Sequence, residues 1–318
     1  MIKTNPILTL LVAAIIICGS SAAVAGGINS NVGTSAFPFL KINIGARAVS
    51  MGGAFTGLAD DESALYYNPA GIASYEQKRF IAGYLNYFDD IQSGFLGYIK
   101  PIKQDKIILG FHISYLNYGE FFETDSVGNL LGNFSGGDLV LAGTVAFKKG
   151  YNWKFGLTSK IIYEKIQAFS ATGLAFDLGA KYSSDREYIS AGLAVQNLGF
   201  QLSGLGNETS KLPLTVRGGG SLKLRRMPLL LAADLILPVD NDLSLAFGGD
   251  YSGLKPFYIR AGWNTFGSNY RAARSEDSWA GLALGFGFDF KNSLHIAYAF
   301  TPGAELGDNH RITLTGGL

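Results

Sequence analysis

The sequence predicts an all-β protein, a transmembrane antiparallel up-and-down β-barrel of about fourteen strands, with an N-terminal hatch or plug segment that contains a short helix. Composition is the first indication, because the 318 residues include 42 glycines, 22 phenylalanines and 16 tyrosines but only 16% charged residues. Glycine is about twice as frequent as in an average soluble protein, and charged residues are clearly rarer. Period-2 alternation and the spacing of the connections are the other two indications.

The first 25 residues resemble a secretory leader. Lys3 provides a basic start, Ile7–Cys18 is apolar, and Ala23–Ala25 is an A-x-A cleavage site. This arrangement predicts a signal peptide, residues 1–25, and a mature chain that begins near Gly26. Two alternatives are an uncleaved signal anchor and a lipoprotein modified at Cys18. The apolar run is short for a membrane span, and the residues before the cysteine are isoleucines.

Cleavage of this leader changes two properties of the chain. It removes Cys18, the one cysteine, so the mature protein can form no internal disulfide and no thiolate metal site. It also removes Lys3, which leaves equal numbers of basic and acidic residues. A neutral chain gives no reason to expect a nucleic-acid partner.

Alternating side chains indicate strands with one large apolar face. Within 138–148, Leu139, Leu141 and Phe147 share one face, and small or polar residues share the other. The segment 279–290 repeats this pattern with glycine, alanine and Asp289 opposite leucine and phenylalanine. A soluble β-sandwich is the alternative to a barrel, but segments of about ten to fifteen residues exceed the usual soluble strand of ~5–6 and suit a tilted membrane crossing.

The predicted barrel comprises residues 78–318, and its connections alternate in length. The long ones, 120–135, 200–210, 265–278 and 302–308, all fall on one side, and short turns fall on the other, as a barrel with short periplasmic turns requires. The hatch, residues 26–77, then joins the first strand on the periplasmic side. The expected strands are 78–88, 92–101, 105–119, 136–148, 151–166, 171–183, 187–199, 211–225, 227–237, 241–252, 254–264, 279–290, 292–301 and 309–318.

Charged residues within these strands are expected to face the lumen, because a Lys or Arg facing lipid at mid-depth costs ~2–4 kcal/mol. Two interpretations are open: a mutually neutralising network that fills the barrel, or direct contact with a substrate. The segment 229–237 is apolar on both faces, which indicates a plug contact or an apolar ligand there. The candidate luminal residues are Asp138, Lys154, Lys160, Asp177, Lys181, Arg217, Lys223, Asp234, Asp250, Asp289, His295 and Arg311.

Signatures of an enzyme are weak. His112, His295 and His310 do not have metal-ligand spacing, and no serine lies in a nucleophile-elbow pattern. The glycine pairs lack the strand-then-helix context of a nucleotide loop. We therefore predict no catalytic residue, no metal and no cofactor, with a barrel enzyme as the remaining alternative.

The segment 45–74 is neither strand-like nor a plain helix. The acidic triplet Asp60–Glu62 precedes a short predicted helix, with its charges favourable at the positive end of the helix dipole, and Pro69 disfavours helical geometry at Asn68. We expect Arg47 to pair with this triplet or with a luminal acid, and the turn 68–71 to pack against the barrel wall. The alternative is a capped helix in a periplasmic tail.

This segment resembles the N-terminal signature of the PorV/PorQ family of outer-membrane proteins, which is similar to the FadL-type transporters. The segments 192–199, 260–263 and 307–312 resemble later motifs of the same family, so the resemblance covers nearly the whole mature chain. The residues that match the N-terminal signature are Gly45, Ala46, Arg47, Met51, Gly52, Gly53, Ala54, Phe55, Asp60, Asp61, Asn68, Pro69, Ala70 and Gly71, with Glu62 completing the acidic triplet.

The resemblance implies a fourteen-stranded barrel whose hatch lies in the lumen, in the outer membrane of a Gram-negative-type bacterium. It implies a non-enzymatic protein that moves hydrophobic compounds across this membrane. The alternative role is that of a type IX secretion accessory that binds exported cargo. The expected partners are the lipid bilayer, hydrophobic small molecules, and secretion components or cargo proteins.

Overall fold

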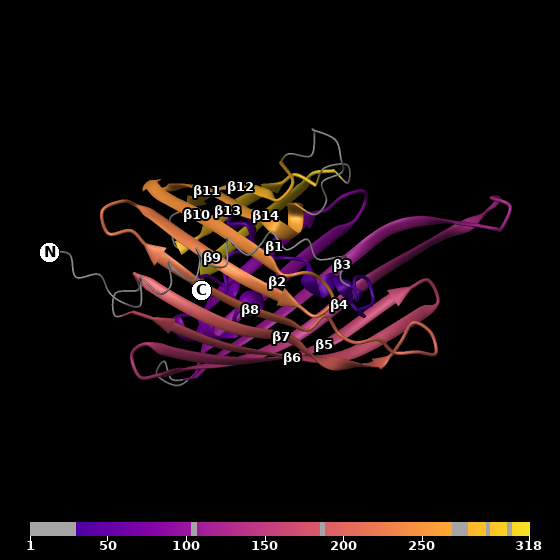
Figure 1. The fold of residues 1–318 in the computed structure, drawn as a ribbon, viewed down its shortest axis with the longest axis horizontal. Helices are drawn as coiled ribbons and strands as arrows, with labels where there is room; N and C mark the ends of the chain where they lie inside the picture. Colours follow the sequence, from indigo (N-terminus) through magenta and orange to yellow (C-terminus); the bar gives the residue numbers. More distant parts are fainter. Residues whose placement is uncertain (1–29, 103–106, 185–187, 269–278, 291–292, 304–306) are drawn as a thin grey trace.

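In the computed structural model, the described residues (30–102, 107–184, 188–268, 279–290, 293–303 and 307–318) form one closed antiparallel barrel of fourteen strands. The predicted leader lies outside them. Each strand pairs with its neighbours in sequence, and β1 closes the barrel against β14, from Arg79 opposite Gly317 to Asn86 opposite His310 (Figure 1). The strands are β1 (Arg79–Asn86), β2 (Gln92–Pro101), β3 (Ile107–Thr124), β4 (Leu130–Lys149), β5 (Trp153–Ile166), β6 (Phe169–Ser183), β7 (Ile189–Ser203), β8 (Thr215–Lys223), β9 (Leu229–Pro238), β10 (Ser244–Leu254), β11 (Phe257–Asn264), β12 (Leu282–Asp289), β13 (His295–Thr301) and β14 (Asn309–Gly317).

The outer face of the wall is apolar, as the alternation predicted. Large apolar side chains remain exposed around the barrel, on strands that pair with a neighbour on both sides. Many of the inward neighbours are small or polar, and others, such as Phe95 and Ile162, are apolar residues buried in the lumen. This is the arrangement that a lipid environment favours. Examples of the exposed set are Leu96, Phe111, Leu141, Ile161, Leu193, Ile259, Phe286 and Ile312.

The two ends of the barrel differ. We call the end where β1 begins and β14 finishes the inner end; its turns include 150–152 and 255–256. The opposite, outer end carries the longer connections 204–214 and 265–281, the second of which contains the short helix α4 (Thr265–Ser268). In outer-membrane barrels the short turns face the periplasm, so the inner end of this barrel corresponds to their periplasmic end.

One predicted long connection is wrong. Most of 120–135 is strand, because β3 and β4 continue past the barrel as an arm, the segment 118–136, which Figure 1 shows projecting at the right. Phe121 stacks on Phe134 across the arm, and the Asp125 carboxylate accepts hydrogen bonds from its turn. A register shift between Asn117 and Glu120 exchanges the two faces, which breaks the period-2 pattern that a sequence reading relies on.

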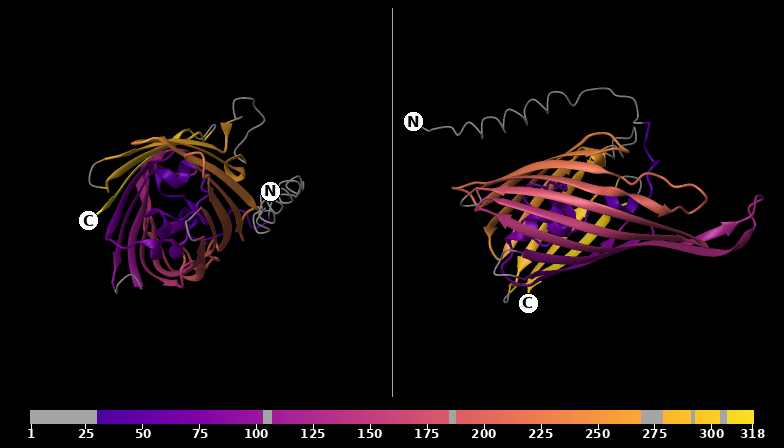
Figure 2. Two further views of the ribbon diagram at one scale, coloured as in Figure 1. Left: turned by 90° about the vertical axis from the view of Figure 1, so that its left-hand side faces the viewer. Right: turned by 90° about the horizontal axis from the view of Figure 1, so that it is seen from below.

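The hatch lies inside the barrel. Its short helices are η1 (Pro38–Lys41), α2 (Ala46–Ser50), α3 (Ala64–Tyr67) and η2 (Pro69–Ser74), and Figure 2 shows this indigo segment filling the lumen. We divide it into a strap, Ser35–Ile44, and a hatch core, Gly45–Ser74. Within the described residues, no helix is both long and apolar enough to cross a membrane.

Glycines on the inner wall allow the hatch core to lie directly on the strands. A Cβ atom added to Gly262 would lie 2.1 Å from the backbone nitrogen of Gly52, and one added to Gly156 would lie 2.4 Å from the Pro69 carbonyl carbon. Added at Gly192, it would lie 2.3 Å from the Thr56 carbonyl oxygen. Any side chain would displace the backbone, so the high glycine content reflects close packing of the plug against the wall.

Candidate functional site

Arg47 is the main electrostatic link between the hatch core and the wall. It lies on α2, and its guanidinium group contacts Asp60 at 2.5 Å, Asp61 at 3.2 Å and the strand residue Asp250 at 2.9 Å. The expected pairing of Arg47 with the acidic triplet and with a luminal acid is therefore present. Burial opposes the charge, but the three carboxylates hold the pKa of Arg47 well above its usual value.

The acidic triplet binds arginines, and Asp61 also accepts a hydrogen bond from the Ser63 backbone at 2.8 Å, at the start of α3. The Asp60 side chain is 33% exposed; its partial burial disfavours the carboxylate, yet Arg47 lowers its pKa below the usual value. Glu62 faces away from Arg47 and pairs with Arg79, the first residue of β1, at 2.5 Å. The helix α3 is only one turn long, and Asn68, with extended backbone, ends it before Pro69 as predicted.

These groups surround a polar cavity of about 440 Å³ at the inner end. Hatch residues form one side of the cavity, and β1 and β10 to β14 form the other. Arg260, which is 2% exposed, contacts Asp250 at 3.2 Å and His295 at 3.2 Å. The lining residues are Arg47, Asp60, Asp61, Glu62, Ser63, Tyr75, Arg79, Asp250, Tyr258, Arg260, Asp289, His295, Ala297, Thr313 and Thr315.

Glu62 should make stability depend on pH. Burial and the neighbouring Asp61 raise the pKa of Glu62 from 4.5 to about 7, against the opposing effect of Arg79. Between these values the folded protein keeps a proton that the unfolded chain has lost, so the free energy of unfolding falls as pH rises, by about 3 kcal/mol in total. Glu62→Gln should remove this fall and be more stable than the wild type at about pH 8.

The measurement is unfolding by urea in detergent micelles at several pH values between about 5 and 8, followed by tryptophan fluorescence. Glu76→Gln is the matched control, because Glu76 is exposed in the same part of the chain. It should leave the slope of stability against pH unchanged. An unaltered slope in Glu62→Gln would refute the assignment.

Buried ion pairs occupy the middle of the lumen. Lys160 contacts Asp177 at 2.7 Å, with the Asn197 side chain 2.8 Å away, and Arg217 contacts Asp234 at 3.2 Å. Because Arg217 also donates to the Gly53 carbonyl oxygen at 2.7 Å, this pair holds the hatch core. These contacts fit the first interpretation of the luminal charges, in which they form a mutually neutralising network inside the barrel.

The remaining charged residues predicted to face the lumen lie on other strands, and most of them also make polar contacts. Lys181 donates to the Leu58 and Ala59 carbonyl oxygens of the hatch core. Asp138 accepts from the Tyr118 hydroxyl at 2.7 Å, and Arg311 donates to Thr301 at 3.2 Å. Three further predicted luminal residues lie near the inner end: Lys154 is buried, Asp289 contacts His295 at 2.6 Å, and Lys223 is exposed at the end of β8.

The Asn68–Gly71 turn packs against the barrel wall, as expected. The Asn68 side chain donates to the Thr56 carbonyl oxygen at 2.9 Å and to the Ala180 carbonyl oxygen at 3.1 Å, and accepts from Ala70. It thus links the turn, the hatch core and β6. Pro69 and Gly71 are buried beside it.

The glycine-rich part of the signature, residues 51–53, contacts β10 and β11. Met51 is fully buried, and Asn264 on β11 donates to the Gly52 carbonyl oxygen at 3.3 Å. Gly52 and Gly53 have φ of 69° and 82°, a left-handed geometry that glycine adopts readily. Gly45, with φ 73°, precedes α2, and an added Cβ there would collide with Ser63.

Sequence reasoning missed several residues of this interface. Arg79 and Arg260 were not among the candidates, although Arg79 directly follows the hatch and Arg260 begins one of the quoted motifs. Gln196, in another quoted motif, donates to the Tyr66 carbonyl oxygen at 2.6 Å. The motifs themselves were the available signal, since the hatch contacts residues in them.

The strap lies at the outer end of the lumen. Ala36 donates to the Lys211 carbonyl oxygen at 2.9 Å, and Lys41 pairs with Asp240 at 2.5 Å. Both partners belong to outer connections, the one between β7 and β8 and the one between β9 and β10. The prediction that the whole hatch lies at the short-turn end is therefore wrong: its junction with β1 lies there, but the strap extends to the opposite end.

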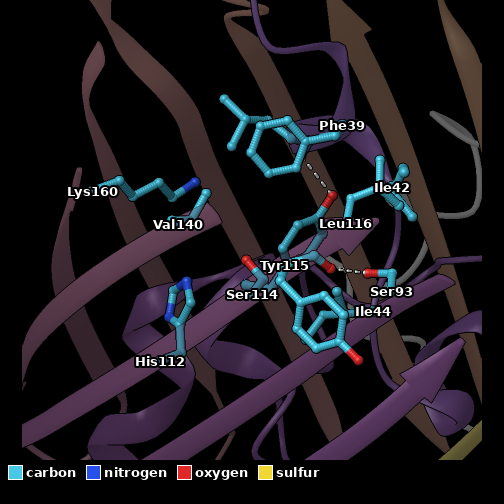
Figure 3. Close-up of a pocket in the computed structure, with 12 residues that line it drawn as sticks. Phe39, Ile42, Ile44, Ser93, His112, Ser114, Tyr115, Leu116, Val140 and Lys160 are labelled. Carbon is cyan, nitrogen blue, oxygen red and sulfur yellow. Dashed lines mark hydrogen bonds between the residues drawn. The ribbon is translucent and has the colours of Figure 1, made fainter. Parts of the chain in front are cut away.

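An apolar cavity separates the strap from β2, β3, β4 and β5 (Figure 3). Its volume is about 30 Å³, room for about one water molecule. Phe39, Leu40, Ile42, Leu116 and Val140 supply apolar walls. His112 and Lys160 add polar groups, and Tyr66 donates to the Leu40 carbonyl oxygen at 3.0 Å.

Among the residues that the structure describes, no group of three or more His, Cys, Asp or Glu side chains is arranged to hold a metal ion.

No protein-family model and no curated protein matches the chain. Among solved structures, it is similar to the Ralstonia pickettii toluene transporter TbuX, at 14% identity and a TM-score of 0.61 over 87% of this chain and 98% of that one. It is also similar to the Pseudomonas putida toluene transporter TodX (13%, TM-score 0.59, over 86% and 96%) and to a Pseudomonas aeruginosa FadL homologue (14%, TM-score 0.52, over 91% and 98%). At these identities the likeness concerns the fold, a FadL-type barrel.

Proposed function

We propose that this protein is an outer-membrane channel for hydrophobic compounds in a Gram-negative-type bacterium, with residues 1–25 as a cleaved leader, 26–77 as the hatch and 78–318 as the barrel. Its structural neighbours are named as transporters and channels of toluene and other hydrocarbons. The proposal assigns no catalytic residue, metal or cofactor.

The apolar cavity between the strap and the wall is the observation that carries this proposal. An aqueous porin would present charged groups along its passage, whereas here the outer half of the lumen holds a cluster of buried apolar residues from strap and strands. His112 is 4% exposed, and its Nδ1 atom has no hydrogen-bond partner within the described part of the chain. The site suits a mostly apolar compound, which gains about 25 cal/mol for each Å² of apolar surface removed from water.

The cavity is too small for any organic compound, so this conformation is closed. Transport therefore requires the strap or the hatch core to move. A compound that passes them reaches the cavity at the inner end, where many of the lining side chains are charged and an apolar compound is held less well. This order of environments favours release into the periplasm.

Filling the apolar cavity should block transport. Ser114 lines it, and Ser114→Phe should reduce uptake of a lipophilic probe by about tenfold, the factor that about 1.4 kcal/mol produces. Uptake is measured with a fluorescent hydrophobic probe in cells that express the variant or the wild type at equal surface levels. Ile113→Phe is the matched control, since Ile113 is the next residue on the lipid-facing side and is 44% exposed. Equal uptake by all three proteins would contradict the channel proposal.

The arm favours a second candidate function, the PorV/PorQ-like role of an accessory that binds exported proteins. It presents Phe122, Val127, Leu130 and Leu131 at 63–81% exposure beyond the barrel. Exposed apolar groups at this density are typical of protein contacts.

The test of this role is the double variant Phe122→Ser/Leu131→Ser. After cross-linking, the wild type should co-purify exported proteins, and the variant should not. Uptake of the lipophilic probe should be the same in both. Equal recovery from both proteins would exclude this role for the arm.

A further inference from the structure

The described chain starts at the outer end of the barrel and leaves at the inner end. Asn31 donates to the Val239 carbonyl oxygen, in the connection between β9 and β10. The strap follows along the outer half of the lumen, the hatch core occupies the inner half, and Lys78 accepts a hydrogen bond from Leu318 at the inner end. The segment 30–78 therefore passes through the barrel from one mouth to the other.

The residues at the outer mouth are accessible. Ser30 to Thr34 are exposed, and Val32 is 46% exposed. Beyond them the chain becomes buried at once, with Phe37 fully buried and its ring against Gly173, near the outer end of β6. The boundary between exposed and buried residues thus coincides with the rim of the barrel.

The N-terminus of a chain cleaved at Ala25 cannot return to the inner side. Gly26 lies five positions before Asn31, a stretch of chain that spans at most ~18 Å, whereas the apolar band of such barrels is ~25 Å tall.

We infer that the mature N-terminus emerges at the cell surface and that the hatch is threaded through its own barrel, an inference that rests on the membrane location and orientation in the proposed function. The strap is then a closure that can be operated from outside. A surface partner that holds the N-terminal residues can pull the strap away from Asp240 and Lys211, whereas nothing in the periplasm reaches it. The hatch core remains tied to β1 by the chain itself.

Labelling of single cysteines tests this inference. The mature chain has no cysteine, so Val32→Cys, Val127→Cys at the tip of the arm and Gln77→Cys at the inner end each carry one thiol. The reagent is a maleimide on a polyethylene glycol chain too large to cross the outer membrane. In intact cells we expect Val32→Cys and Val127→Cys to react fully, and Gln77→Cys to react only after the outer membrane is permeabilised.

The controls separate the possible failures. If Val127→Cys reacts in intact cells and Val32→Cys does so only after permeabilisation, the threaded path is wrong while the barrel and its orientation stand. If Gln77→Cys reacts in intact cells and Val127→Cys does not, the orientation is inverted, and both this inference and the proposed function fail. Reaction of all three in a soluble periplasmic fraction would refute the membrane location.

Discussion

Arg47→Ala is expected to release the hatch core from the barrel wall, because it leaves the half-buried Asp61 and the buried Asp250 each with one partner fewer. Asp250 is 7% exposed at its side chain and keeps only Arg260, while Asp60 and Asp61 lose their cation. Removal of one partner from a buried ionic cluster costs about 3–5 kcal/mol. Local unfolding of the hatch core should therefore become several hundred-fold more frequent, since each 1.4 kcal/mol is a factor of ten.

Hydrogen exchange of the purified protein in detergent, read by mass spectrometry, measures this effect peptide by peptide. Amides in residues 46–63 should lose protection, while the strands, whose hydrogen bonds do not involve Arg47, should keep theirs. Arg226→Ala is the matched control, because Arg226 is exposed in the turn between β8 and β9. Arg47→Lys should lie between the two, since lysine keeps the charge but cannot contact three carboxylates with a planar fork. Unchanged exchange in Arg47→Ala would show that the other contacts of the hatch core hold it without the Arg47 cluster.

The barrel was predictable because the membrane imposes one rule on every strand. A residue such as Leu141 or Phe286 must face lipid, and its neighbours must then face the lumen, so alternation and connection length suffice to find the strands. The same rule fails in the arm, which extends beyond the lipid. There the bulge between Asn117 and Glu120 and the exposed faces on both sides remove the pattern.

The site was predictable only where its partners are close in sequence or share a strongly patterned segment. Arg47 and Asp60 belong to one short segment, and lipid forces Asp250 inward, so their pairing followed from charge. Arg260 joins the same cluster from a neighbouring strand, and that arrangement depends on strand register. Register depends on inter-strand hydrogen bonds that no local pattern reports.

The strap is the part of the site that sequence reasoning could not place. Residues 35–44 have no period, and the partners of Ala36 and Lys41 lie in connections about 175 to 200 positions later in the chain, at 211 and 240. A loop contact of this kind depends on how the closed barrel brings connections together. Its role in the proposed function follows from the cavity that the strap covers, which exists only in the folded protein.

Cross-linking the strap to the wall should abolish transport through the channel. The Lys41 Nζ atom lies 2.5 Å from Asp240 Oδ2, so the two side chains point toward each other across the outer mouth. In Lys41→Cys/Asp240→Cys, a short bifunctional methanethiosulfonate reagent can span the resulting gap and fix the strap in its closed position. Because the apolar cavity of about 30 Å³ admits no organic compound, uptake of a lipophilic probe should fall to that of cells without the protein.

Reduction of the cross-link provides the decisive comparison, because it restores the same molecules to their unlocked state. Uptake should then return to at least the wild-type rate, since the double variant lacks the Lys41–Asp240 ion pair that holds the strap. Each single variant, treated with the same reagent, carries a modified side chain but no bridge and should transport normally. If the bridged protein transports as fast as the reduced one, then compounds pass without strap movement, and the opening must lie in the hatch core, where the Arg47 cluster rather than Asp240 would control it.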